Sequence, residues 1–173
     1  MPPEAINQLV SLQQFRVFSA IAECYNQLKD YKRNLKYLKA ALDSAQNAHK
    51  LESQKTYASY EYKMQNLWEK ENSTSAHQWI ERGISELLFS MTNVILTLKN
   101  FHEALIYSIQ SNLWGMNCVS LLKDLLTDKS KYLFKNDEAK FYKLAQVYFD
   151  VSRFYSLTLK NTGDIFQSLD QFD

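Results

Sequence analysis

The feature that most constrains this chain is its near lack of residues that reverse a backbone. Its 173 residues contain three glycines and two prolines, and neither type occurs between Glu4 and Arg82. A β-sheet protein needs a turn about every 8–12 residues, and such turns depend on glycine and proline. The sequence therefore predicts an all-α protein, in which long helices are joined by short polar turns.

Charge and composition indicate a folded protein without a general ionic target. The formal net charge is +1, and 46% of the residues are hydrophobic. This balance provides no general attraction to nucleic acid or anionic membrane. The N-terminus lacks a basic signal-peptide region, and the most apolar window, 84–98, is too short to cross a bilayer. We therefore expect an intracellular protein, cytoplasmic or nuclear, that binds no nucleic acid.

No arrangement of reactive side chains predicts catalysis. His49, His77 and His102 are far apart and form no metal-ligand spacing. Three isolated glycines cannot build a phosphate-binding loop. Cys24 and Cys118 belong to no CxxC motif, and we expect both to be buried free thiols. The sequence therefore predicts a protein that is not an enzyme and holds no cofactor, metal or small-molecule ligand.

The most specific pattern is a repeated four-residue segment, called a tetrad below. The leucines that open the three tetrads are 70 and 71 residues apart: Leu28-Lys29-Asp30-Tyr31, Leu98-Lys99-Asn100-Phe101 and Leu169-Asp170-Gln171-Phe172. Matched residues precede each leucine by three, six, seven and ten positions: Tyr25/Ile95/Phe166, Ala22/Thr92/Gly163, Ile21/Met91/Thr162 and Phe18/Leu88/Leu159. These spacings lie on one helix face. We interpret each tetrad as the turn of a helical hairpin.

The hairpin pattern resembles the tetratricopeptide repeat, whose first helix ends in a comparable Leu-Gly-x-Tyr turn. In that family the second helix carries a small residue three positions after the turn aromatic, which Ala104 matches and Asn34 does not; Ala41 matches the next small position. The family unit is about 34 residues long, so the tetrad spacing covers two units. Either the intermediate units are degenerate or the helices are longer than in the family. The resemblance implies antiparallel hairpins stacked as a solenoid.

Polar breaks and the tetrads divide the chain into one helical-repeat domain, which we expect to belong to a longer protein. We expect a hairpin at about 5–50, linking helices at about 51–82, a second hairpin at about 84–126, a loop at 127–137, and a helix with the start of a third hairpin at 138–173. Gly83 marks a kink or a helix end. Whether residues 31–70 form one helix or two stays open. The aromatic density from Phe141 to Tyr155 favours a final helix covered on both sides over one with an exposed apolar strip.

The resemblance implies a scaffold that binds a peptide or helix of another protein. Candidate binding residues face away from the hairpin partners of the first helices: Glu23, Asn26, Asn93 and Lys160. Some family members grip a peptide carboxylate with lysine, arginine and asparagine. Ser19 and Glu23 stand where that clamp has lysine and asparagine, and only Asn93 matches it. The resemblance therefore does not extend to binding of a C-terminal carboxylate.

A basic helix face is the second candidate surface. Five residues follow a spacing of three or four: Lys29, Lys32, Arg33, Lys36 and Lys39. They suit a solvated face, an acidic segment of a partner protein or anionic lipid headgroups. If residues 31–69 formed one helix of about 60 Å, the chain would resemble BAR-type membrane-shaping dimers with this face against lipid. That dimer is the alternative to the scaffold.

Overall fold

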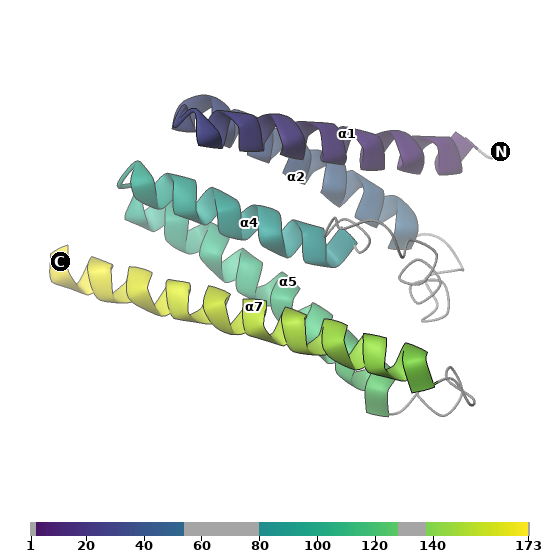
Figure 1. Cartoon of the computed structure of the whole chain (residues 1–173). Helices are drawn as coiled ribbons and strands as arrows, with labels where there is room; N and C mark the ends of the chain where they lie inside the picture. The colour runs from purple at the N-terminus through teal and green to yellow at the C-terminus, as the bar shows by residue number, and fades with distance from the viewer. Residues whose placement is uncertain (1–2, 54–79, 128–137, 173) are drawn as a thin grey trace.

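The computed structural model describes residues 3–53, 80–127 and 138–172 (Figure 1). These residues form five helices joined within each hairpin by a short turn: α1 (Pro3–Gln27), α2 (Tyr31–Ser53), α4 (Ile80–Thr97), α5 (Phe101–Thr127) and α7 (Glu138–Phe172). Because every described element is a helix, the all-α prediction is confirmed. Most of the linking region expected at 51–82, and the question of one or two helices over 31–70, lie outside the described residues.

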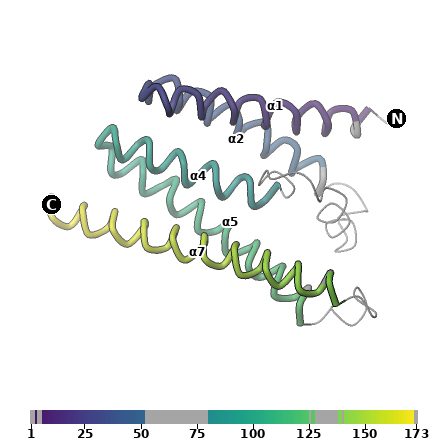
Figure 2. Tube along the Cα trace, viewed as in Figure 1, coloured from purple at the N-terminus to yellow at the C-terminus, as the bar shows by residue number. Residues whose placement is uncertain are grey.

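The helices form a stack in which each contacts the next in chain order. α1 packs along α2, and α4 along α5, as two hairpins; α2 then packs on α4, and α5 on α7. Successive helices run in opposite directions, so that α1, α4 and α7 all point the same way (Figure 2). Each hairpin thus presents its second helix to the first helix of the next.

Two glycine-free turns create these hairpins. Lys29 and Lys99 have left-handed φ angles of 57° and 60°. In the first turn the Asp30 amide donates to the Tyr25 carbonyl (3.0 Å), and the Lys29 amide donates to the Asn26 carbonyl (3.0 Å). This pair of hydrogen bonds defines a Schellman motif, which satisfies carbonyls at the end of a helix. The Asn100 and Lys99 amides make the equivalent bonds in the second turn.

The last residue of each turn also starts the next helix. Asp30 Oδ1 accepts a hydrogen bond from the Arg33 amide (3.2 Å), and Asn100 Oδ1 accepts one from the Glu103 amide (3.3 Å). Aspartate and asparagine are strong N-caps because their short side chains reach the amides of the first helical turn. The predicted reversals at the first two tetrads are confirmed, and capping explains how they form without glycine.

The third tetrad lies within a helix instead. α7 continues to Phe172, and Gln171 occupies the position that Asp30 and Asn100 use for capping. Glutamine is not among the residues that favour an N-cap. The described residues therefore contain no turn at this tetrad, where the internal repeat predicted the start of a third hairpin.

The expectation that the last helix is covered on both sides is wrong for the described residues. α7 packs on α5, and the side facing away carries large aromatic residues in solvent: Tyr142 is 68% exposed and Phe149 is 61% exposed. The aromatic density reflects a buried face and an exposed face on the same helix.

Gly83 is a packing position and not a helix end, because α4 continues on both sides of it. A Cβ atom at Gly83 would lie 2.9 Å from Phe15 Cζ. Phe15 is almost completely buried in the core that α1, α2 and α4 share. The missing side chain therefore allows α1 to approach α4 closely at this point.

We expect Gly83→Ala to lower the free energy of unfolding by about 1–3 kcal/mol, because Phe15 must move from a packed position. Gly163→Ala is the matched control, since a Cβ at Gly163 meets nothing within 4 Å. That change should stabilise the helix by about 0.5–1 kcal/mol. Urea unfolding measures both, and equal effects of the two substitutions would contradict the packing role of Gly83.

Candidate functional site

A groove lies between α1, α2 and α4 and has a volume of about 390 Å³. Three of the residues selected from the sequence line it together: Glu23, Asn26 and Asn93. The other polar residues of the lining are Ser19 from α1, Tyr31 and Asn34 from α2, and Glu86, Ser90 and Thr97 from α4. Among the described residues of the lining there is no lysine or arginine. Two hairpins thus assemble an acidic and polar groove.

Asn34, which departs from the small residue of the resembled family, lies buried at this groove. It is only 3% exposed, and its Nδ2 donates to the Ala22 carbonyl at 2.6 Å. Its Oδ1 is buried and has no hydrogen-bond partner in the structure. Ala104, at the equivalent position of the second hairpin, is fully buried. The departure from the family pattern was the one sequence signal for this residue.

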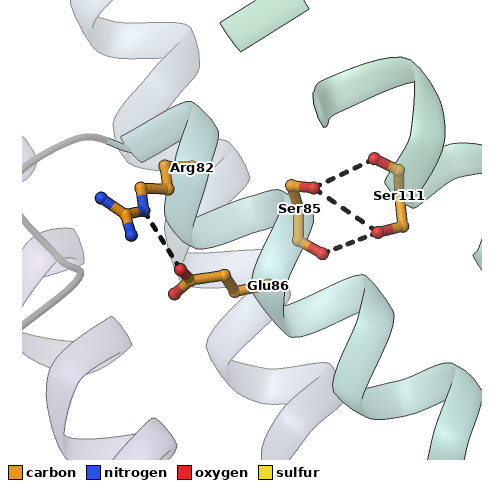
Figure 3. A network of polar contacts seen from close by, with 4 residues as sticks. All are labelled: Arg82, Ser85, Glu86 and Ser111. Carbon is orange, nitrogen blue, oxygen red and sulfur yellow. Dashed lines mark hydrogen bonds and ion pairs between the residues drawn. The ribbon is translucent and has the colours of Figure 1, made fainter. Parts of the chain in front are cut away.

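The two carboxylates of the groove come from different hairpins. Glu23 Oε1 accepts a hydrogen bond from Gln27 Nε2 at 3.4 Å, and Glu86 Oε1 accepts one from Arg82 Nε at 3.2 Å (Figure 3). Burial raises the pKa of Glu86, although the nearby Arg82 guanidinium opposes this shift. Glu86 was not predicted from the sequence, because helical periodicity does not indicate that α4 brings it to the side facing α1.

Hydrogen bonds between α4 and α5 orient the groove side of α4. Ser85 Oγ donates to the Ser111 carbonyl (3.0 Å), and Ser111 Oγ donates to the Ser85 carbonyl (2.9 Å). Figure 3 shows Ser85 turned towards Ser111, whereas Glu86, the next residue, points away with Arg82. Fixing one face of α4 against α5 therefore leaves Glu86 on the groove side.

Lys160, the fourth candidate on the first helices, is not part of the groove. It lines a separate shallow surface with Arg82 of α4 and with residues of α7. The neighbouring Asn161 does reach the groove region, because its Nδ2 donates to Asn93 Oδ1 at 3.2 Å. The structure thus brings three of the four candidates together and places the last beside a different hollow.

The five basic candidates are exposed in the first turn and on α2, as expected for a solvated face. Acidic groups accompany them: Arg33 pairs with Asp30 at 3.4 Å, and Lys39 pairs with Glu103 of α5 at 3.8 Å. Asp43 lies in the same surface hollow as Lys32 and Lys36. These exposed pairs contribute little to stability, and they dilute the positive charge of the face.

A further surface, the outer face of α1, was missed by the sequence analysis. Its residues recur at steps of three or four along the helix, and none of them is charged. They are Ile6, Val10, Gln13, Val17, Ala20, Cys24 and Gln27. All seven residues are exposed. The prediction of a buried free thiol is confirmed for Cys118 and wrong for Cys24, which lies in this stripe.

The internal repeat shows that this exposure is unusual. Val17 stands eleven residues before the tetrad leucine and is 54% exposed, whereas its counterparts Leu87 and Thr158 are 6% and 1% exposed. Val10 is 49% exposed, whereas Ile80 and Val151 are 8% and 3% exposed. α4 and α7 turn these positions towards the second helix of the preceding hairpin. On α1 the same apolar positions have no covering helix among the described residues.

Comparisons with protein-family models, with curated proteins and with solved structures gave no match. Among the described helices, none has the length and apolar character needed to cross a membrane. Histidine, cysteine, aspartate and glutamate side chains form no group suited to a metal ion in the described parts of the chain. The surfaces described above therefore have to be interpreted from their own chemistry.

We expect Glu86→Gln to change the pH dependence of stability. Because the folded state raises the pKa of Glu86 above its usual 4.5, the folded protein binds this proton more tightly than the unfolded chain. The carboxyl therefore lowers the free energy of unfolding as the pH rises from the usual pKa through the raised one. The stability of Glu86→Gln relative to the wild type should be greater at about pH 7 than at about pH 4.

Urea unfolding at both pH values measures this difference. Arg82→Gln is the companion variant: it removes the cation that opposes the shift, and its stability should fall more steeply with rising pH than that of the wild type. A difference between Glu86→Gln and the wild type that does not change with pH would contradict the interpretation.

Proposed function

We propose that this protein is a non-catalytic scaffold, a tetratricopeptide-like stack of helical hairpins that binds a helix of a partner protein on the outer face of α1. The observation that carries the proposal is the exposure of Val10 and Val17 at positions where α4 and α7 bury their residues. Solvent-facing helix surfaces are normally polar. A continuous uncharged stripe indicates a surface that another element covers.

The chemistry of the expected partner follows from the contacts inside the stack. α2 packs on α4 in the antiparallel direction, and it contributes small residues to the core shared with α1 and α4: Ala41, Ala45 and Ala48, all completely buried. Such residues allow close approach of two helices. The proposed occupant is therefore an amphipathic helix, antiparallel to α1, whose apolar face carries small and aliphatic residues.

The energy available at this face suits a specific contact. Complete burial of one valine side chain contributes about 1.5–3 kcal/mol relative to exposure. The face also carries Ile6, and Leu9 lies beside it; both are about half exposed, at 48% and 49%. Several such side chains along one helix are enough to offset part of the entropy lost when two proteins associate.

The opposite end of the stack supports the same proposal. Leu159 and Phe166 of α7 are 45% and 48% exposed. Leu88 and Ile95, which hold the same repeat positions on α4, are buried, and α4 packs against α5, the second helix of its hairpin. Both ends therefore expose apolar faces at positions that are covered inside the stack. This is the arrangement expected of a helical-repeat stack whose end faces bind helices of a partner.

The BAR-like membrane dimer gains no comparable support from the described residues. Its long helix depends on residues 54–70, which lie outside them, and the basic face is interrupted by Asp30 and Asp43. In the scaffold, the basic face can instead add a contact to an acidic segment of the partner. Its charge mixture makes it a weaker basis for a proposal than the outer face of α1.

Photo-crosslinking from Gln13 tests the proposal, because this residue is exposed at the centre of the outer face. A benzophenone amino acid at position 13 should form an adduct with another protein inside the cell. The crosslinked peptide of that protein should carry apolar residues at every third or fourth position, as one face of a helix does. Val10→Glu with Val17→Glu should reduce the adduct about tenfold or more, because two charges would be buried without partners. Val10→Thr with Val17→Thr is the size-matched control and should retain most of it.

A second probe position separates specific contact from collision. The same benzophenone group at Gln46, exposed on α2, should not form this adduct. Equal adducts at the two positions, or an adduct at Gln13 that survives both glutamates, would overturn the proposal.

A further inference from the structure

The groove between α1, α2 and α4 contains two carboxylates and a buried amide oxygen as hydrogen-bond acceptors. Glu23 and Glu86 each have one carboxylate oxygen bonded to a side chain of their own helix, and the second oxygen of each makes no hydrogen bond to any described residue. Among the described residues the lining contains no lysine or arginine, and only Glu86 has a cation at its carboxylate, the Arg82 guanidinium of its own helix. A ligand that enters it therefore meets negative charge and acceptors.

Asn34 provides an independent indication of a ligand. Its side chain is almost completely buried, it belongs to the lining, and its Oδ1 has no hydrogen-bond partner. Its Nδ2 already donates a hydrogen bond to the Ala22 carbonyl. This bond fixes the orientation of the amide and leaves Oδ1 as the atom that still lacks a partner. Buried acceptors in folded proteins nearly always have a donor. A donor brought by a ligand would satisfy this oxygen.

The rest of the lining is apolar. Phe15 comes from α1, Leu38 from α2, and Leu87 and Val94 from α4. A group that suits this combination has an aliphatic stem and a charged end that donates hydrogen bonds. Lysine and arginine side chains have this form, since their methylene stems pack on apolar surfaces while their heads stay polar.

We propose that this groove binds the cationic side chain of a lysine or arginine in a peptide segment of another protein. The stem packs against the apolar lining, and the charged head faces Glu23, Glu86 and Asn34. The volume of about 390 Å³ exceeds that of one side chain, so the groove also has space for the neighbouring backbone. Ser90 and Asn93 can bond that backbone. The site is separate from the outer face of α1 and does not depend on the scaffold proposal.

The test uses the whole chain and four short peptides that differ at one central residue: lysine, arginine, norleucine or glutamate. Titration calorimetry measures binding, and the Asn34 side-chain amide resonance reports on the groove. The lysine and arginine peptides should bind and shift this resonance. The norleucine peptide, which keeps the stem and lacks the charge, should bind about tenfold more weakly, and the glutamate peptide should not bind.

Glu23→Gln with Glu86→Gln should weaken the lysine peptide about tenfold or more. Glu23→Gln alone changes an exposed residue, so it should leave the fold intact and give an intermediate loss. Glu103→Gln is the matched control, because Glu103 pairs with Lys39 outside the groove. Val17→Glu should leave peptide binding unchanged, so failure of the scaffold proposal would not affect this measurement.

Three outcomes would overturn the proposal. The norleucine peptide could bind as tightly as the lysine peptide, or Glu103→Gln could weaken binding as much as the groove variants. A free diamine such as cadaverine could also bind as tightly as the peptide, which would assign the groove to small amines and not to protein segments.

Discussion

Two capped left-handed turns determine the architecture of this protein. Lys29 and Lys99 adopt φ angles that cost a non-glycine residue free energy, and the hydrogen bonds that Asp30 and Asn100 make to both adjoining helices offset this cost. Because one short residue ends the first helix and caps the second, the two helices must run back along each other. The resulting register stacks Tyr25 on Tyr37 at 5.5 Å and places Asn34 beneath the Ala22 carbonyl.

The extent to which the sequence predicted this fold follows from the range of the interactions involved. The repeated tetrads and the matched residues before them lie within a few residues of each turn, so the reversals at the first two tetrads were predicted from the sequence, whereas the third tetrad lies within α7. The groove depends instead on the packing of α2 against α4, which are separated by the residues between Ser53 and Ile80. Periodicity placed Glu23, Asn26 and Asn93 on suitable faces, but no local pattern shows that Glu86 lines the same groove as Glu23.

The same limit explains the missed outer face of α1. A helix with apolar residues on two sides can be fully buried, or it can bury one side and present the other to a partner; the sequence pattern is the same in both cases. Cys24 was expected to be buried on this ground. Only the comparison with α4 and α7 distinguishes the cases, because it shows that the positions of Val10 and Val17 are covered wherever a preceding hairpin exists.

The two proposed surfaces lie on roughly opposite sides of one helix. Ser19, Glu23 and Asn26 of α1 line the groove, while Val10 and Val17 face outwards. α1 is also the edge helix of the stack, packed on α2 and next to α4 through Phe15 and Gly83. The absence of a side chain at Gly83 leaves the space that Phe15 occupies, so α1 lies close enough to α4 for both helices to line the groove. The side of α1 that faces α4 therefore carries the polar lining, and its other side carries the uncharged stripe.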